Sequence, residues 1–189
     1  MIIVFLKQIL IMKTTFFTLL LTICLAFNVQ GQNFNDLDVS PMDTASFPTS
    51  YRNSDKSIRV IYSRPQLKGR ELSALTPEGK VWRTGANEAT EITLYEDFSL
   101  GETEVKAGTY TLYTIPGEES WTVIINSATN VWGAYGYNKD LDVARVDVPV
   151  QKLKSPVEVL SMVFQEADKG AHLHIAWGHV HIAVPFTKS

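Results

Sequence analysis

The sequence predicts an all-β protein, a single-domain antiparallel β-sandwich of the jelly-roll-like or immunoglobulin-like kind. From Ser57 onward, apolar and polar residues alternate with a period of two, the pattern of half-buried strands. Glycine and proline recur at short, fairly even intervals between these runs, as turns between short strands do. No long stretch of this part of the chain has apolar residues at helical spacing, which argues against alternating strand–helix units.

The expected strands are rich in β-branched and aromatic residues, which favour pleated surfaces. In chain order they are SIRVIYS (57–63), EITLY (91–95), GTYTLYTI (108–115), WTVIIN (121–126), VARVDVPV (143–150) and VEVLSMVF (157–164). The last is apolar on both faces, as a central strand is expected to be.

The C-terminal segment AHLHIAWGHVHIAVPF (171–186) predicts a hairpin with its turn at Gly178 and His179. Apolar residues before and after this turn would share the core-facing side; they are Leu173, Ile175 and Trp177, then Ile182, Val184 and Phe186.

All four histidines lie in this segment, and His172, His174 and His181 would point away from the core. In the predicted hairpin, His174 and His181 would lie diagonally across the two strands, close enough to share a metal ion. Because no nearby Asp, Glu or Cys completes a ligand set, the sequence predicts no metal site and no cofactor.

Residues 1–31 contain no Asp or Glu, and Lys13 precedes the apolar run TTFFTLLLTICLAF. This pattern predicts a signal peptide that ends before Gln32, with Met12 as a possible true start. An uncleaved anchor is the alternative, but the run is shorter than the ~20 apolar residues that a spanning helix needs. We therefore expect an exported protein, periplasmic or extracellular, without a membrane span after cleavage.

After cleavage the chain would lack cysteine, because Cys24 is its only one, and it would form no disulfide. Residues 32–56 are polar and predict an extended N-terminal arm before a sandwich domain of residues 57–189. The formal net charge is −3 and the basic residues are scattered, so nucleic acid is not an expected partner.

The segment VWRTGANEAT (81–90) places several polar residues around a predicted turn. It allows two interpretations. In the first, Arg83 holds an anionic or hydroxyl-rich ligand, Asn87 donates and accepts hydrogen bonds, and Glu88 acts as an acceptor or base. In the second, Arg83 and Glu88 form a structural ion pair and Asn87 bonds the turn backbone.

The glycine-rich segment NVWGAYGYNKD (130–140) places Trp132, Tyr135 and Tyr137 on a predicted loop. Aromatic rings on loops can stack on sugars or peptides. Alternatively, Trp132 and one of the tyrosines close the open end of the sandwich.

These features favour a non-catalytic binding module for a small molecule, a carbohydrate, a peptide or another envelope component. Its candidate ligand-binding residues are Arg83, Asn87, Glu88, Trp132, Tyr135 and His172. One alternative is a hydrolase that uses Glu88 as its catalytic residue, with Arg83 or His172. The other is a purely structural module. The sequence contains no nucleophile elbow, no zinc-protease helix motif and no phosphate-binding loop.

Several segments together resemble the DUF2911 family of exported proteins common in Bacteroidetes. They are SPMD (40–43), YSRPQLKGRE (62–71), GKVWRTGANEATEIT (79–93), AGTYTLYTIPG (107–117), WTVIIN (121–126), WGAYGYN (132–138), DVARV (142–146) and GAHLHIAW (170–177). The resemblance implies a small, exported, β-rich domain of unassigned function, and it supplies no catalytic residues.

Overall fold

A computed structural model describes residues 1–25 and 32–188 and divides the chain into two compact units, residues 1–36 and 37–189. The first unit contains the helix α1 (Ile2–Leu25). Within the described residues, no helix is both long and apolar enough to cross a membrane. The predicted cleavage position after Gly31 lies outside the described residues.

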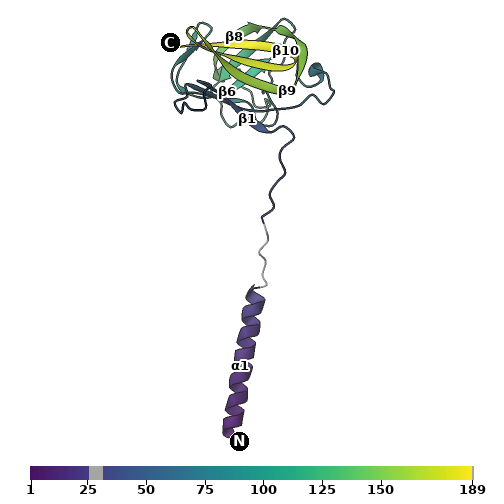
Figure 1. The fold of residues 1–189 in the computed structure, drawn as a ribbon, viewed down its shortest axis with the longest axis vertical. Coiled ribbons are helices and arrows are strands. Elements are labelled where there is room, and N and C mark those ends of the chain that lie inside the picture. The colour runs from purple at the N-terminus through teal and green to yellow at the C-terminus, as the bar shows by residue number, and fades with distance from the viewer. Residues whose placement is uncertain (26–31, 189) are drawn as a thin grey trace. The chain divides into compact units, whose positions relative to one another are not determined.

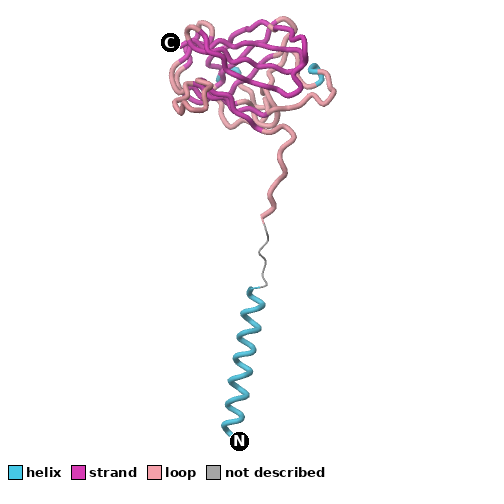
Figure 2. Tube along the Cα trace, in the orientation of Figure 1, coloured by secondary structure: helices cyan, strands magenta, loops and turns pink. Residues whose placement is uncertain are grey.

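The second unit is an antiparallel β-sandwich, as the sequence predicts (Figures 1 and 2). One sheet has the strand order β1-β2-β3-β6-β7-β8 and the other β5-β4-β10-β9. The strands of the first sheet are β1 (Met42–Phe47), β2 (Ile58–Ser63), β3 (Glu91–Leu94), β6 (Gly108–Ile115), β7 (Ser120–Asn126) and β8 (Asp142–Pro149). Those of the second are β4 (Phe98–Leu100), β5 (Thr103–Val105), β9 (Gln151–Ala167) and β10 (Gly170–Lys188). Two short 3₁₀ helices, η1 (Leu72–Ala74) and η2 (Lys139–Leu141), lie in connections.

Every strand predicted between 57 and 164 is present, and the structure adds three. β1 lies in the segment predicted as an extended arm and pairs with β2 along its whole length. β4 and β5 form a hairpin of three residues each, too short for an alternating pattern to indicate it.

The core between the sheets includes a cluster of three tryptophans. Trp82 stacks on Trp177 of β10, with ring centroids 5.9 Å apart and planes 11° from parallel. The same ring meets the edge of Trp121 of β7 at 6.0 Å. Because β7 and β10 belong to different sheets, Trp82 anchors the segment 81–90 between both layers.

The predicted turn at Gly178 and His179 is wrong. β10 is one strand of 19 residues, and β9 is its hairpin partner through a turn at Asp168 and Lys169 (Figure 1). Gly178 has φ +57°, and the register with β9 shifts on both sides of it. This irregularity shifts the alternation of buried and exposed side chains by one residue. The apolar residues before Gly178 and those after it are therefore buried on the same side of the strand. A hairpin with its turn at Gly178 would have buried the same residues.

The two sheets are joined at the edge of β9 by the chain that follows β2. The Leu67 amide donates to the Glu158 carbonyl at 2.9 Å, and the Leu160 amide donates to the Pro65 carbonyl at 3.0 Å. These bonds cover an edge that would otherwise expose unpaired backbone groups.

Candidate functional site

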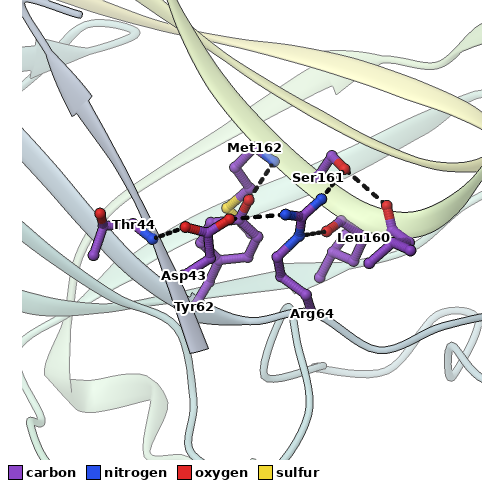
Figure 3. A network of polar contacts seen from close by, with 8 residues as sticks. Asp43, Thr44, Tyr62, Arg64, Leu160, Ser161 and Met162 are labelled. Carbon is purple, nitrogen blue, oxygen red and sulfur yellow. Dashed lines mark hydrogen bonds and ion pairs between the residues drawn. The ribbon is translucent and has the colours of Figure 1, made fainter. Parts of the chain in front are cut away.

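Arg64 forms a network that ties β1 and β2 to β9 (Figure 3). Its Nε donates to the Leu160 carbonyl at 3.1 Å, Nη1 to Asp43 Oδ2 at 2.9 Å and Nη2 to Ser161 Oγ at 2.9 Å. Beside it, the Tyr62 hydroxyl accepts a hydrogen bond from the Met162 amide at 3.0 Å. Since each nitrogen of the guanidinium has a partner, Arg64 is a structural element that holds the sheets together.

Burial of the Tyr62 hydroxyl in this network raises the pKa of that phenol above its usual value. The bond from the Met162 amide acts in the opposite direction but is outweighed. Tyr62 is therefore a neutral acceptor at the junction of the sheets.

The backbone of segment 81–90 is held by two different neighbours. Trp82 and Thr114 of β6 exchange a pair of backbone hydrogen bonds of 2.7 and 3.0 Å. Six residues later, Glu88 forms a β-bridge with Trp132, and the Ala89 amide donates to the Val131 carbonyl at 2.8 Å. The segment thus crosses from β6 to the loop that follows β7.

Between these two attachments the chain turns through Thr84 and Asn87, which have φ values of +55° and +58°. The Thr84 hydroxyl shares a hydrogen bond of 3.0 Å with the Thr114 hydroxyl, and the Thr84 carbonyl accepts from Thr90 Oγ1 at 2.8 Å. Positive φ at Asn87 agrees with the turn chemistry of asparagine. At Thr84 the left-handed conformation of a β-branched residue is held by these buried bonds.

The ion pair between Arg83 and Glu88 is not formed, because the two residues leave the turn toward different neighbours. In the part of the chain that the structure describes, Arg83 has one side-chain hydrogen bond, from Nε to the Gly85 carbonyl at 3.2 Å. Glu88 is exposed, and its carboxylate bonds no described residue. Asn87 donates through Nδ2 to Asp38 Oδ1 at 3.2 Å.

Arg83 lines a cavity of about 220 Å³ at the surface of the sandwich. The other described lining residues are all uncharged: Pro77, Val81, Trp82, Ala134 and Tyr135. The loop of residues 130–140, the aromatic loop, approaches Arg83 closely. A methyl group added to Gly133 would lie 3.7 Å from Arg83 Nη1. The arrangement presents a cation with free donors beside apolar and aromatic walls.

The aromatic loop has two exposed rings and one half-buried ring. Tyr135 is 87% exposed and Trp132 is 60% exposed, so neither closes the end of the sandwich. Tyr137 instead packs on the outer face of the six-stranded sheet: its ring meets Tyr113 at 5.3 Å, and its hydroxyl donates to Asp142 Oδ2 at 2.6 Å. Burial, together with the neighbouring Asp142, raises the pKa of Tyr137 to about 12.

The structure brings five of the six predicted ligand-binding residues into neighbouring parts of the fold. Arg83 and Tyr135 share the cavity, Glu88 is bridged to Trp132, and Asn87 lies on the same turn. His172 does not join them, because it is an exposed residue of β10 in the other sheet.

The histidines of β10 form a separate cluster on the outer face of the four-stranded sheet. His174 Nδ1 lies 2.8 Å from His181 Nε2, and His181 Nδ1 lies 3.1 Å from Gln151 Oε1. The irregularity at Gly178 brings the two rings together, although they belong to one strand and not to two. Among the described residues, no group of three His, Cys, Asp or Glu side chains is placed to enclose a metal ion.

Residues 40–186 match a family described as "protein of unknown function (DUF2911)". The chain belongs to the DUF2911 family. The matched region contains the whole sandwich up to Phe186, with both the Arg64 network and the Arg83 cavity, whereas the helix α1 lies outside it. No curated protein and no solved structure matches the chain. Membership of the DUF2911 family therefore assigns no activity.

Proposed function

We propose that this protein is an exported, non-catalytic binding domain that takes a carboxylate-bearing glycan at the Arg83 cavity. The observation that carries the proposal is the guanidinium of Arg83, whose terminal nitrogens have no acceptor among the described residues. Export is proposed from the leader pattern of residues 1–31.

A half-buried guanidinium with unused donors favours an anionic ligand. Its terminal nitrogens are open to solvent, and a carboxylate can accept from two of their N–H groups at once in a planar fork. No acidic side chain is among the residues that line the cavity, so nothing there competes with an anion. The first chemical requirement of the ligand is therefore a carboxylate.

The exposed rings supply the second requirement. Tyr135 at the cavity and Trp132 on the same loop present large aromatic surfaces, on which the apolar face of a sugar ring can stack. The cavity, at about 220 Å³, is smaller than a typical small-molecule site of roughly 300–1,000 Å³. It suits one acidic unit of a longer glycan that continues across the open surface.

The hydrolase alternative has weaker support. A catalytic carboxyl group needs an environment that adjusts its pKa and a partner that orients it, and Glu88 is exposed without a described partner. The structural alternative explains Trp82, Thr84 and Thr90, whose bonds and contacts hold the fold, but it gives the terminal nitrogens of Arg83 no role.

Calorimetric titration with oligogalacturonate, and with its neutral methyl ester, tests the proposal. We expect the acid form to bind and the ester to bind at least about tenfold more weakly, because a charged hydrogen-bonded pair contributes about 1.5–3 kcal/mol. Arg83→Ala should abolish this preference and Arg83→Lys should restore part of it. Arg59→Ala, which removes an exposed arginine of β2, is the matched control.

Equal binding of acid and ester, or an unchanged preference in Arg83→Ala, would contradict the proposal. A peptide with a free C-terminal carboxylate serves as a third ligand. If it binds through Arg83 and the glycan does not, the ligand class is a peptide and the glycan assignment fails.

A further inference from the structure

The rings of His174 and His181 are joined by a hydrogen bond within one plane. Their planes differ by 8° and their centroids are 5.0 Å apart, while His174 Nδ1 and His181 Nε2 are 2.8 Å apart. The centroid separation is close to that N···N distance plus the two ring radii. The rings therefore lie edge to edge and share an N–H···N bond, and they do not stack face to face.

The contact with Gln151 Oε1 indicates which nitrogen carries each proton. That oxygen accepts from His181 Nδ1, so His181 Nε2 has a free lone pair. That lone pair accepts the bond from His174 Nδ1–H. A neutral His174 then has a lone pair, and no proton, on Nε2.

His174 Nε2 is buried, and it has no hydrogen-bond partner among the described residues. Burial, with smaller contributions from His181 and His172, lowers the pKa of His174 below its usual value. Buried acceptors without a partner are rare and call for an explanation.

We propose that His172 and His174 bind a divalent transition-metal ion, with His181 and Gln151 as the supporting layer behind His174. The two ligands lie two residues apart on one face of β10, and their ring centroids are 6.2 Å apart. Two imidazoles on one tetrahedral ion have centroids about 5 Å apart, given bonds of about 2.0–2.1 Å. The observed separation of the two ring centroids is therefore only about 1 Å longer than a shared ion needs, and the ring of His172 is exposed.

The supporting layer is of the kind that metal-binding histidines use. Such a histidine donates its second N–H to a fixed acceptor, which orients the ring and holds its tautomer. His181 accepts from His174 in this way, and Gln151 holds His181 in turn. Because no third His, Cys, Asp or Glu of the described chain completes the group, water fills the remaining positions.

The chemistry of the site limits the choice of ion. Imidazole nitrogen suits Zn²⁺, Ni²⁺ and Cu²⁺, and Cu²⁺ is expected to bind most tightly. The site lies in the four-stranded sheet, so it does not depend on the Arg83 cavity.

Calorimetric titration of Cu²⁺, Ni²⁺ and Zn²⁺ into the full-length chain tests the proposal, with Cys24→Ser as background and no histidine tag. We expect His174→Gln to abolish binding and His172→Ala to weaken it at least tenfold. His181→Ala should weaken it about 10- to 100-fold, as loss of a supporting partner does. His179→Ala is the matched control and should leave the affinity unchanged, because its Nδ1 contacts the Leu153 carbonyl instead.

Titration curves of His174→Gln or His181→Ala that match the parent chain would overturn the proposal. Nitrogen NMR of the imidazoles gives an independent readout that a loss of stability cannot imitate. The metal-free chain should show His174 Nε2 without a proton, and its signal should move when Zn²⁺ is added. A proton on His174 Nε2 in the metal-free chain would also overturn it.

Discussion

Arg64 and Arg83 are two arginines of one sandwich in opposite situations. Arg64 uses all three guanidinium nitrogens on groups that belong to β9 and β1. Arg83 uses Nε on a carbonyl two residues away, and its terminal nitrogens bond nothing in the described part of the chain. The first arrangement stabilises the fold, and the second leaves charge and donors available to a ligand.

The same contrast recurs in the aromatic loop. Tyr137 packs against Tyr113 and bonds Asp142, while Tyr135 is almost fully exposed beside Arg83. In each pair the two residues are of the same type, and only their interaction partners differ. What separates a structural residue from a candidate binding residue is therefore whether its polar groups are already satisfied.

The largest expected effect on stability is that of Arg64→Ala. The change removes bonds to Asp43, Leu160 and Ser161, and we expect a loss of about 2–3 kcal/mol in the free energy of unfolding. Denaturant unfolding measures it, and the melting temperature should fall by about 5–10 °C. A loss below about 0.5 kcal/mol would remove the contrast with Arg83.

A double-mutant cycle between Arg64 and Asp43 sharpens the comparison. Their side chains are 33% and 43% exposed, so the ion pair itself should contribute only about 0.5–1 kcal/mol. We expect Asp43→Ala to cost less than Arg64→Ala, because the bonds to β9 survive. A coupling energy as large as the whole Arg64→Ala effect would mean that the ion pair, and not the bonds to β9, joins the sheets.

Tyr137→Phe should cost about 1 kcal/mol at pH 7, since it removes the hydrogen bond to Asp142. The pKa of Tyr137 is raised from 10.0 to about 12 in the folded chain. The unfolded state therefore loses this proton first, and stability falls as pH rises from about 10 toward 12. Stability measured across this range should fall less steeply in Tyr137→Phe, whereas identical slopes would contradict the assignment.

Most strands of the sandwich could be predicted, because the alternation of apolar and polar residues along a strand follows the alternation of buried and exposed side chains. The prediction failed at β10, where one irregular position at Gly178 produces the same burial pattern as a turn would. It also missed β4 and β5, whose three residues each are too few to show a period.

The sequence indicated five residues that the structure brings into neighbouring parts of the fold, but not their arrangement. Proximity across a turn suggested that Arg83 and Glu88 pair, yet the turn is shaped by partners distant in sequence, Thr114 and Trp132. The Arg64 network gave no local signal, since its partners lie 21, 96 and 97 residues away. The proximity of His174 and His181 was predicted, whereas Gln151, 30 residues from His181, gave no local signal.

The smallest expected effect on stability is that of Arg83→Ala, the variant that also tests whether Arg83 binds the carboxylate of the ligand. This substitution should change the free energy of unfolding by less than about 0.5 kcal/mol, because no described ion pair is broken. The direct test is one calorimetric titration of oligogalacturonate into this variant beside the parent chain. We expect a folded variant that no longer prefers the acid form over its methyl ester; a variant that keeps the full preference would rule out Arg83 as the ligand-binding residue.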